Sequence, residues 1–247
     1  MAHTDIPGRM AAPAGPSGPE HAPAVLGSLI PEGSFSPGAA ELDDDEILAR
    51  FERWVSSVRH LTLWPHQEEA VLSLLSGNHA IVSTPTGSGK SLIAVAMHFM
   101  ALCRGRRSYY TAPIKALVSE KFFELVSIFG AGYVGMITGD TRINPQAPVI
   151  CCTAEILANQ ALRKGEKADI SYVAMDEFHF YGDPDRGWAW QIPLLVLHNA
   201  QFLLMSATLG DTGDIAALVE GHTGRAVDTV ADAPRPVPLE YTYAAEP

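Results

Sequence analysis

The chain has 247 residues, 47% of them hydrophobic, and a formal net charge of −11. This length and composition predict one main α/β domain of roughly 200 residues with a sizeable core. No apolar run approaches the roughly 20 residues that span a bilayer, and no signal-peptide pattern opens the chain, so we expect a cytoplasmic protein with no membrane partner.

The acidic charge gathers at the start of the chain. Residues 1–47 hold eight acids and one base, a net of −7, which leaves −4 for the other 200 residues. A nearly neutral body can still carry a local basic track for nucleic-acid phosphates. The candidates are Arg104, Arg106, Arg107, Lys115 and Lys121, and separately Arg163, Lys164 and Lys167.

The first 40 residues are rich in Pro, Gly, Ala and Ser, which predicts a disordered tail because such residues bury little apolar surface. From Asp43 onward, apolar residues recur at helical spacing and acids occupy the first turn, which predicts an amphipathic helix. A second helix is predicted over residues 68–75, ending at Gly77.

Short apolar runs then alternate with helical patterns, which is typical of βαβ units. Strands are predicted at residues 80–83, 109–112, 133–137, 149–153, 172–176 and 202–206. Helices are predicted at residues 91–103, 116–129, 154–162, 188–197 and 212–219. The fold class is therefore α/β, with a mainly parallel sheet sandwiched by helices and the functional site along one sheet edge.

A glycine-rich segment follows the first predicted strand and opens the next predicted helix: Thr84-Pro85-Thr86-Gly87-Ser88-Gly89-Lys90-Ser91. Gly87 and Gly89 allow a tight turn whose N–H groups point at phosphate oxygens. Lys90 would reach the β- and γ-phosphates, and the Ser91 hydroxyl would ligate Mg²⁺. Thr84 replaces the usual first glycine, and a chance glycine-rich turn is the alternative.

Two adjacent acids, Asp176 and Glu177, end a predicted buried strand 86 residues after Lys90. Asp176 would hold Mg²⁺, and Glu177 would orient or deprotonate the attacking water. His179 would couple this site to its surroundings. The alternative is a solvated turn with a structural histidine.

These motifs, in this order, resemble the DExH branch of the superfamily 2 helicases over residues 64–209. The resemblance implies a RecA-like P-loop NTPase fold, ATP hydrolysis with Mg²⁺, and single-stranded RNA or DNA as partner. It also implies that Gln67 in Pro65-His66-Gln67 selects adenine. The family tolerates Thr at the position of Thr84.

Four further segments resemble the family's motifs for nucleic-acid contact and coupling. Thr111-Ala112-Pro113-Ile114-Lys115 resembles motif Ia, Thr138-Gly139-Asp140 resembles a short motif after the next strand, and Thr153-Ala154-Glu155 resembles motif Ib with Ala in place of Pro. Ser206-Ala207-Thr208 is identical to motif III. The resemblance implies nucleic-acid contacts from Pro113, Lys115, Gly139 and Thr153, and coupling roles for Ser206 and Thr208. A helix cap would also explain Thr153.

The resemblance divides the chain into the tail of residues 1–40, an ATP-binding domain of residues 41–222, and a linker of residues 223–247 that includes Pro234–Pro238. In this family a second RecA-like lobe supplies arginines to the γ-phosphate, and in related nucleotide hydrolases such an arginine is worth about 10³ to 10⁵ in rate. We expect the chain to be a fragment of a longer helicase with little activity alone.

Two other function classes are open. A non-catalytic nucleotide- or nucleic-acid-binding module acting on a partner would carry the same motifs. A small-molecule kinase would share only the phosphate loop, and it has no need for Gln67 and Ser206-Ala207-Thr208 together. Contacts to backbone phosphates are shared by RNA and DNA, so the motifs do not choose between them.

Overall fold

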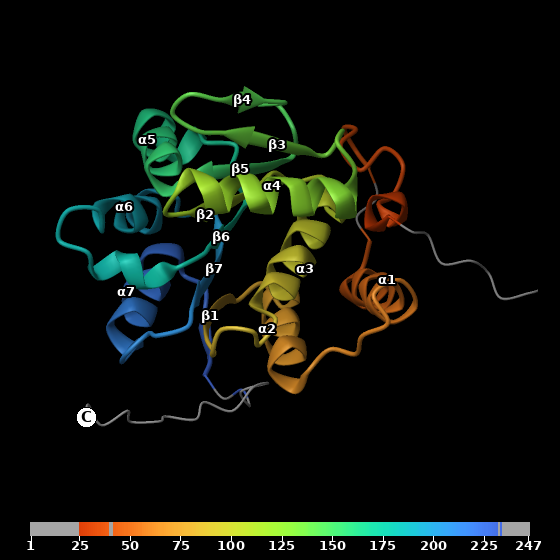
Figure 1. Ribbon diagram of the computed structural model, residues 1–247, viewed down its shortest axis with the longest axis horizontal. Coiled ribbons are helices and arrows are strands. Elements are labelled where there is room, and N and C mark those ends of the chain that lie inside the picture. The colour runs from red at the N-terminus through yellow and green to blue at the C-terminus, as the bar shows by residue number, and fades with distance from the viewer. Residues whose placement is uncertain (1–24, 40–41, 232, 234–247) are drawn as a thin grey trace, which may run out of the picture.

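The computed structural model describes residues 25–39, 42–231 and 233 (Figure 1). These residues form an eight-stranded sheet in the order β4-β3-β5-β2-β6-β7-β1-β8. All neighbouring strands are parallel except β3 and β4. The strands are β1 (His79–Ser83), β2 (Ser108–Ala112), β3 (Val134–Ile137), β4 (Arg142–Ile143), β5 (Val149–Thr153), β6 (Tyr172–Met175), β7 (Gln201–Ser206) and β8 (Val227–Val230).

Helices cover both faces of this sheet (Figure 1). One face packs on α1 (Asp44–Ser57), α2 (Pro65–Leu75), α3 (Lys90–Cys103) and α4 (Lys115–Phe129), and the other on α5 (Ala154–Lys164), α6 (Trp188–Val196) and α7 (Gly213–Thr223). Three short 3₁₀ turns complete the described elements: η1 (Leu26–Leu29), η2 (Gly165–Lys167) and η3 (Phe178–Gly182).

The side chains of β1 show why both faces need helices. Ala80 and Val82 join the core beneath α1 to α4, whereas Ile81 joins the core beneath α5 to α7. Because successive side chains point to opposite faces, an apolar strand buried on both sides reads as a continuous apolar run. The predicted α/β fold with a mainly parallel, helix-sandwiched sheet is confirmed.

The six predicted strands are all present, and two strands were not predicted. One of them, β8, lies within the predicted linker and pairs in parallel with β1, with His79 opposite Val227. Asp228 of β8 accepts hydrogen bonds from Ser73 Oγ at 2.7 Å and Asn78 Nδ2 at 2.9 Å. The sequence reading failed here because a four-residue edge strand containing Asp and Thr has little apolar pattern of its own. Residues 234–247 of that linker lie outside the described residues.

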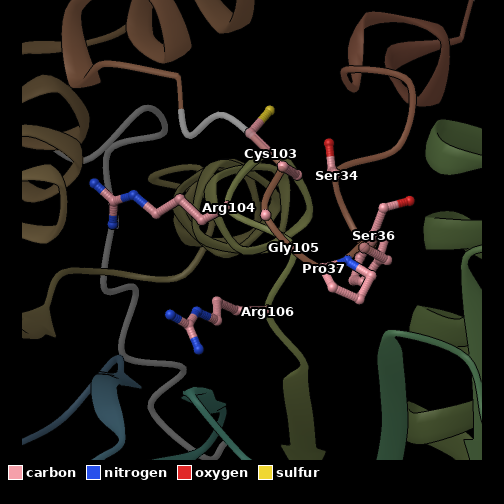
Figure 2. Close-up of a pocket in the computed structure, with 10 residues that line it drawn as sticks. Ser34, Ser36, Pro37, Cys103, Arg104, Gly105 and Arg106 are labelled. Carbon is pink, nitrogen blue, oxygen red and sulfur yellow. The ribbon is translucent and has the colours of Figure 1, made fainter.

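The predicted tail is also wrong over residues 25–39, while residues 1–24 lie outside the described part. Leu26 and Ile30 are buried in the core, and η1 packs on α4 so closely that a Cβ on Gly27 would lie 2.0 Å from the Phe129 carbonyl oxygen. Residues 34–37 pass beside the end of α3, and together with residues 103–106 they line a cavity of about 330 Å³ (Figure 2). The average composition of residues 1–40 concealed this short apolar anchor.

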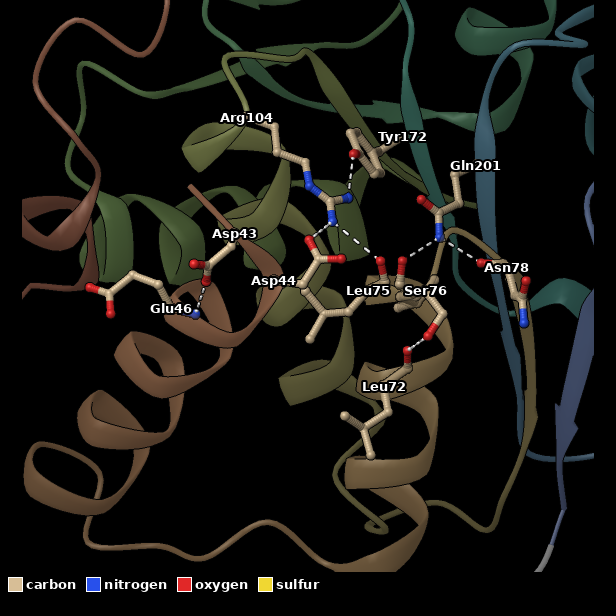
Figure 3. A network of polar contacts seen from close by, with 11 residues as sticks. Asp43, Asp44, Glu46, Leu72, Leu75, Ser76, Asn78, Arg104, Tyr172 and Gln201 are labelled. Carbon is tan, nitrogen blue, oxygen red and sulfur yellow. Dashed lines mark hydrogen bonds and ion pairs between the residues drawn. The ribbon is translucent and has the colours of Figure 1, made fainter. Parts of the chain in front are cut away.

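Arg104 ties three elements together at the amino edge of the sheet (Figure 3). Its Nη2 donates to Asp44 Oδ1 of α1 at 2.5 Å and to the Leu75 carbonyl of α2 at 3.3 Å, and its Nη1 donates to the Tyr172 hydroxyl of β6 at 2.9 Å. Residues 104–107 lead into β2, whereas Lys115 follows its other end. The prediction that Arg104 and Lys115 belong to one basic surface is therefore wrong. Arg104 lies at the amino edge of the sheet and Lys115 at the carboxyl edge.

Across the described ranges, no helix combines the length and apolarity required to cross a bilayer.

Candidate functional site

The glycine-rich segment forms the turn between β1 and α3. Gly87 and Gly89 have φ angles of +85° and +81°, a region that side chains with a Cβ disfavour. Inside the turn, the buried hydroxyls of Thr84 and Ser88 are hydrogen-bonded at 2.6 Å. The first turn of α3 therefore directs its free N–H groups into the space enclosed by the loop.

Lys90 lies across the mouth of this loop. Its Nζ donates to the carbonyl oxygens of Thr84 at 2.5 Å and Pro85 at 3.0 Å. Burial lowers the pKa of Lys90, and the negative charges of Asp176 and Glu177 oppose that effect. The ammonium group thus lies between loop carbonyls and carboxylates, where a phosphate oxygen could take over its hydrogen bonds.

The two acids follow β6, which only β7 separates from β1. Asp176 Oδ1 accepts from the Glu177 N–H at 2.9 Å, and Oδ2 accepts from the Tyr110 hydroxyl of β2. Burial, then the nearby Asp176, raises the pKa of Tyr110 well above its usual value, so the phenol stays a donor. Glu177 adopts a left-handed conformation with φ +50°, which costs on the order of 1 kcal/mol for such a residue and turns the chain sharply after β6.

The loop and the acids enclose one cavity of about 290 Å³. Among the described residues that line it, Lys90 is the one base and no arginine is present, while Met205 of β7 and Ala207, just after β7, line the opposite side. The predicted phosphate-binding and catalytic residues are therefore brought together at the carboxyl edge of the sheet. The lining residues are Thr86, Gly87, Gly89, Lys90, Ser91, Asp176, Glu177, Met205 and Ala207.

Gln67 lies behind the loop and does not line that cavity. Its Nε2 donates to the carbonyls of Ser88 at 3.3 Å and Gly89 at 3.1 Å, and its Oε1 accepts from the Trp64 N–H at 2.9 Å. His66 Nε2 is also 2.8 Å from the Ser88 carbonyl. With 6% of its surface exposed, Gln67 holds the loop backbone in place. Adenine selection by Gln67 stays a prediction.

The three predicted coupling residues meet beside Glu177. His179 Nδ1 lies 3.3 Å from Ser206 Oγ and 3.3 Å from Glu177 Oε2. The Thr208 N–H donates to the same Ser206 oxygen at 3.3 Å. The motif at the end of β7 is thus in direct contact with the acidic motif that follows β6.

The predicted nucleic-acid residues lie farther along the same edge, outside the cavity. Lys115 Nζ donates to Asp140 Oδ2 at 2.6 Å, which together with a bond from Thr138 lowers the pKa of Asp140 to about 2. Gly139 adjoins this pair. Thr153 is the N-cap residue of α5, as the capping alternative expects, although in the described structure its side chain makes no capping hydrogen bond.

Three residues make contacts near the site that the sequence did not predict. Tyr110, which bonds Asp176, has the appearance of an ordinary core residue of an apolar strand. Arg186, which bonds Pro113 and Glu155, lies in a polar turn with no motif. Lys121 was placed on the basic track, but only 7% of it is exposed, and its Nζ donates to Ser91 Oγ at 2.9 Å and Glu124 Oε2 at 2.6 Å. Partners 30 residues or more away in the sequence, such as Ser91 for Lys121, leave no local pattern.

Comparison with known families matches residues 64–215 to the DEAD/DEAH box helicase family. The chloroplastic DExH-box ATP-dependent RNA helicase DExH15 of Arabidopsis thaliana is 31% identical over 217 residues, which cover 85% of this chain and 18% of that protein. The antiviral helicase SKI2 of Saccharomyces cerevisiae is 34% identical over 190 residues, which cover 74% of this chain and 15% of that protein. The chain thus spans less than a fifth of the length of these curated relatives.

Among solved structures, the DUF1998 helicase MrfA bound to DNA superposes with a TM-score of 0.57 at 21% identity, covering 74% of this chain and 27% of that one. At this identity the likeness shows a shared fold. It agrees with the RecA-like arrangement of a mainly parallel sheet between two helical layers.

Proposed function

Because the chain belongs to the DEAD/DEAH box helicase family and is homologous to ATP-dependent helicases, we propose that it binds and hydrolyses ATP and binds single-stranded RNA or DNA as one motor lobe. One observation carries the proposal. The cavity of about 290 Å³ unites the phosphate loop with Asp176 and Glu177.

In this proposal the loop N–H groups and Lys90 bind the phosphates of ATP and neutralise their charge. Lys90 exchanges its bonds to Thr84 and Pro85 for bonds to the β- and γ-phosphates. Glu177 orients the attacking water and accepts its proton, since its carboxylate lies at the cavity wall with His179 beside it.

The donor set at the cavity fits Mg²⁺, a cation that is usually held by one or two carboxylates together with substrate phosphates. Asp176 and Ser91 supply oxygens, and each keeps a free lone pair after the bonds from Tyr110, the Glu177 N–H and Lys121. These two residues would hold the ion. When bound, Mg²⁺ neutralises charge on the phosphate oxygens.

For the nucleic acid we propose Pro113, Lys115, Gly139 and Thr153 as contacts to backbone phosphates. Pro113 and Gly139 lie in the turns after β2 and β3, Lys115 begins α4, and Thr153 ends β5, so all four lie at the carboxyl edge. Lys115 would leave Asp140 and bind a phosphate instead. Breaking this ion pair costs little free energy, because both side chains are at least half exposed.

We expect slow turnover unless another unit supplies an arginine, since no arginine of the described residues lines the cavity. The second RecA-like lobe of a full-length helicase is the proposed source. The same observation favours the alternative, a nucleotide- and nucleic-acid-binding module that regulates a partner without productive catalysis.

The test is binding of a fluorescent ATP analogue with Mg²⁺ to the native chain and to Lys90→Ala, with phosphate release measured with and without single-stranded RNA. Loss of binding in the variant, with slow release by the native chain, supports the proposal. Unchanged binding in Lys90→Ala contradicts the phosphate-loop assignment. Binding without any release by the native chain, even with an added second lobe, favours the non-catalytic module.

A further inference from the structure

Arg186, in the turn between η3 and α6, contacts two segments next to the proposed nucleic-acid residues: the turn after β2 and the first turn of α5. Its Nη2 donates to the Pro113 carbonyl at 2.5 Å and to Glu155 Oε1 at 2.5 Å, and its Nε donates to the same Glu155 oxygen at 3.1 Å. Pro113 lies two residues before Lys115, and Glu155 lies two residues after Thr153. One guanidinium group therefore bridges the turn after β2 and the first turn of α5, which its rigid fork of donors allows.

The same guanidinium group lies against the aromatic residues that follow the acidic motif. Its Cζ is 5.7 Å from the Phe180 ring centroid and 5.9 Å from that of Trp190. These two rings are stacked at 5.4 Å with an interplanar angle of 18°. Such contacts place a cation where the ring faces attract it.

Phe180 in turn contacts His179, with ring centroids 4.7 Å apart. His179 contacts both Glu177 and Ser206 at 3.3 Å. Packed side chains thus join the catalytic carboxylate to the nucleic-acid loops without a gap, and Arg186 is where the path divides toward Pro113 and Glu155. These contacts form a continuous route from His179 and Glu177 to the turn after β2 and to the start of α5.

We propose that Arg186 is a positioning residue that couples nucleotide binding to nucleic-acid binding. This inference rests on the proposed function and adds a regulatory link between its two sites. By thermodynamic linkage, nucleotide then changes the affinity for the single strand by the same factor as the strand changes the affinity for nucleotide. Such couplings are typically about 5- to 150-fold.

The test measures this factor on the 247-residue chain. Anisotropy of a fluorescein-labelled single-stranded oligonucleotide gives its affinity with and without saturating Mg²⁺ and a non-hydrolysable ATP analogue. The native ratio of the two affinities should be at least about fivefold. Arg186→Ala should bring the ratio close to one, with nucleotide affinity in the absence of nucleic acid unchanged. Arg186→Lys should behave alike, because an ammonium group cannot reproduce the planar fork and the ring contacts.

Arg53→Ala is the matched control, since it removes an exposed guanidinium from α1 and should leave the ratio unchanged. If Arg186→Ala does not fold, Glu155→Gln decides, because it weakens the Arg186 bonds at nearly constant volume and should also lower the ratio. The inference is overturned if the Arg186 variants keep the ratio of strand affinities that the native chain shows. It is also overturned if these variants lose nucleotide affinity to the same extent when no nucleic acid is present. If the native chain binds the oligonucleotide with the same affinity with and without nucleotide, the coupling is overturned and the proposed function stands. If the native chain does not bind the oligonucleotide at all, the proposed function is overturned.

Discussion

Gly89 shows at the scale of one residue how the loop and its support are fitted together. A Cβ at this position would lie 2.2 Å from Gln67 Nε2, and the backbone φ of +81° is one that alanine resists. Gln67 cannot retreat freely, because its amide also bonds the Ser88 carbonyl and the Trp64 N–H. The residue expected to read adenine thus also determines the shape of the phosphate loop.

Gly89→Ala is therefore expected to abolish binding of the fluorescent ATP analogue while the fold persists. The added methyl must displace either the loop or the Gln67 amide, and both hold the N–H groups in place for phosphate. Gly221→Ala is the control, since a Cβ on that α7 residue would meet nothing within 4 Å. Equal binding by Gly89→Ala and the native chain would contradict the described loop geometry.

His79 illustrates the scale of the element, because it joins β1 to its neighbours through a buried ring. Its Nδ1 accepts from the Phe202 N–H of β7 at 2.9 Å, and its Nε2 lies 2.7 Å from Thr223 Oγ1 at the end of α7. Burial, and then the positive charge of Arg225, lowers the pKa of His79 to about 4. The neutral ring is thus part of the junction between β1, β7 and α7.

This shift predicts a pH dependence of stability. Between pH 6.5 and about pH 4 the unfolded state binds a proton at His79 that the folded state does not, so the free energy of unfolding falls as pH falls through that window. One group contributes a slope of up to about 1.4 kcal/mol per pH unit. Urea denaturation should show a shallower dependence in His79→Gln, which keeps a donor and an acceptor but does not titrate.

His98 is also buried, which lowers its pKa to about 3, but it does not affect the difference in stability between the native chain and His79→Gln. It is present in both proteins and cancels in the difference between them. Parallel pH profiles for the native chain and His79→Gln would contradict the assigned protonation state.

At the scale of the whole molecule, residues 25–39 belong to the body and cross its face beside α4 and the end of α3 (Figure 1). Arg50 Nη1 donates to the Leu29 carbonyl at 2.8 Å, and a Cβ on Gly105 would lie 1.9 Å from the Ser34 carbonyl oxygen. These close approaches leave no room for side chains at Gly27 and Gly105, so the segment and the body are shaped to one another.

Leu26→Ala is expected to lower the free energy of unfolding by about 2 kcal/mol or more, the usual cost of removing a buried leucine side chain. Denaturant unfolding and limited proteolysis within residues 25–39 measure this. Phe35→Ala is the control in the same segment, because Phe35 is 47% exposed and its loss should change little. Equal stability of Leu26→Ala and the native chain would mean that the segment contributes nothing to the fold.

Local patterns predicted the glycine-rich turn between β1 and α3, the two acids after β6 and the six main strands. Residues 149–153 were predicted with the observed bounds, and the other strands differ by one residue at an end. These features depend on the chain near each residue: buried strands need apolar runs, and a tight phosphate-binding turn needs glycine.

The sequence by itself therefore determined the α/β fold and the two halves of the proposed ATP site, because each half is a short segment with its own chemical signature. Only the tertiary structure decided that β8 extends the sheet, that Leu26 anchors the start of the body, and that Gln67 supports the loop. It also placed Lys121 beside Ser91 and Arg186 between Pro113 and Glu155. These contacts join residues from about 20 to 150 positions apart, and their energy depends on distance and burial that arise only when the sheet brings its strand ends to one edge.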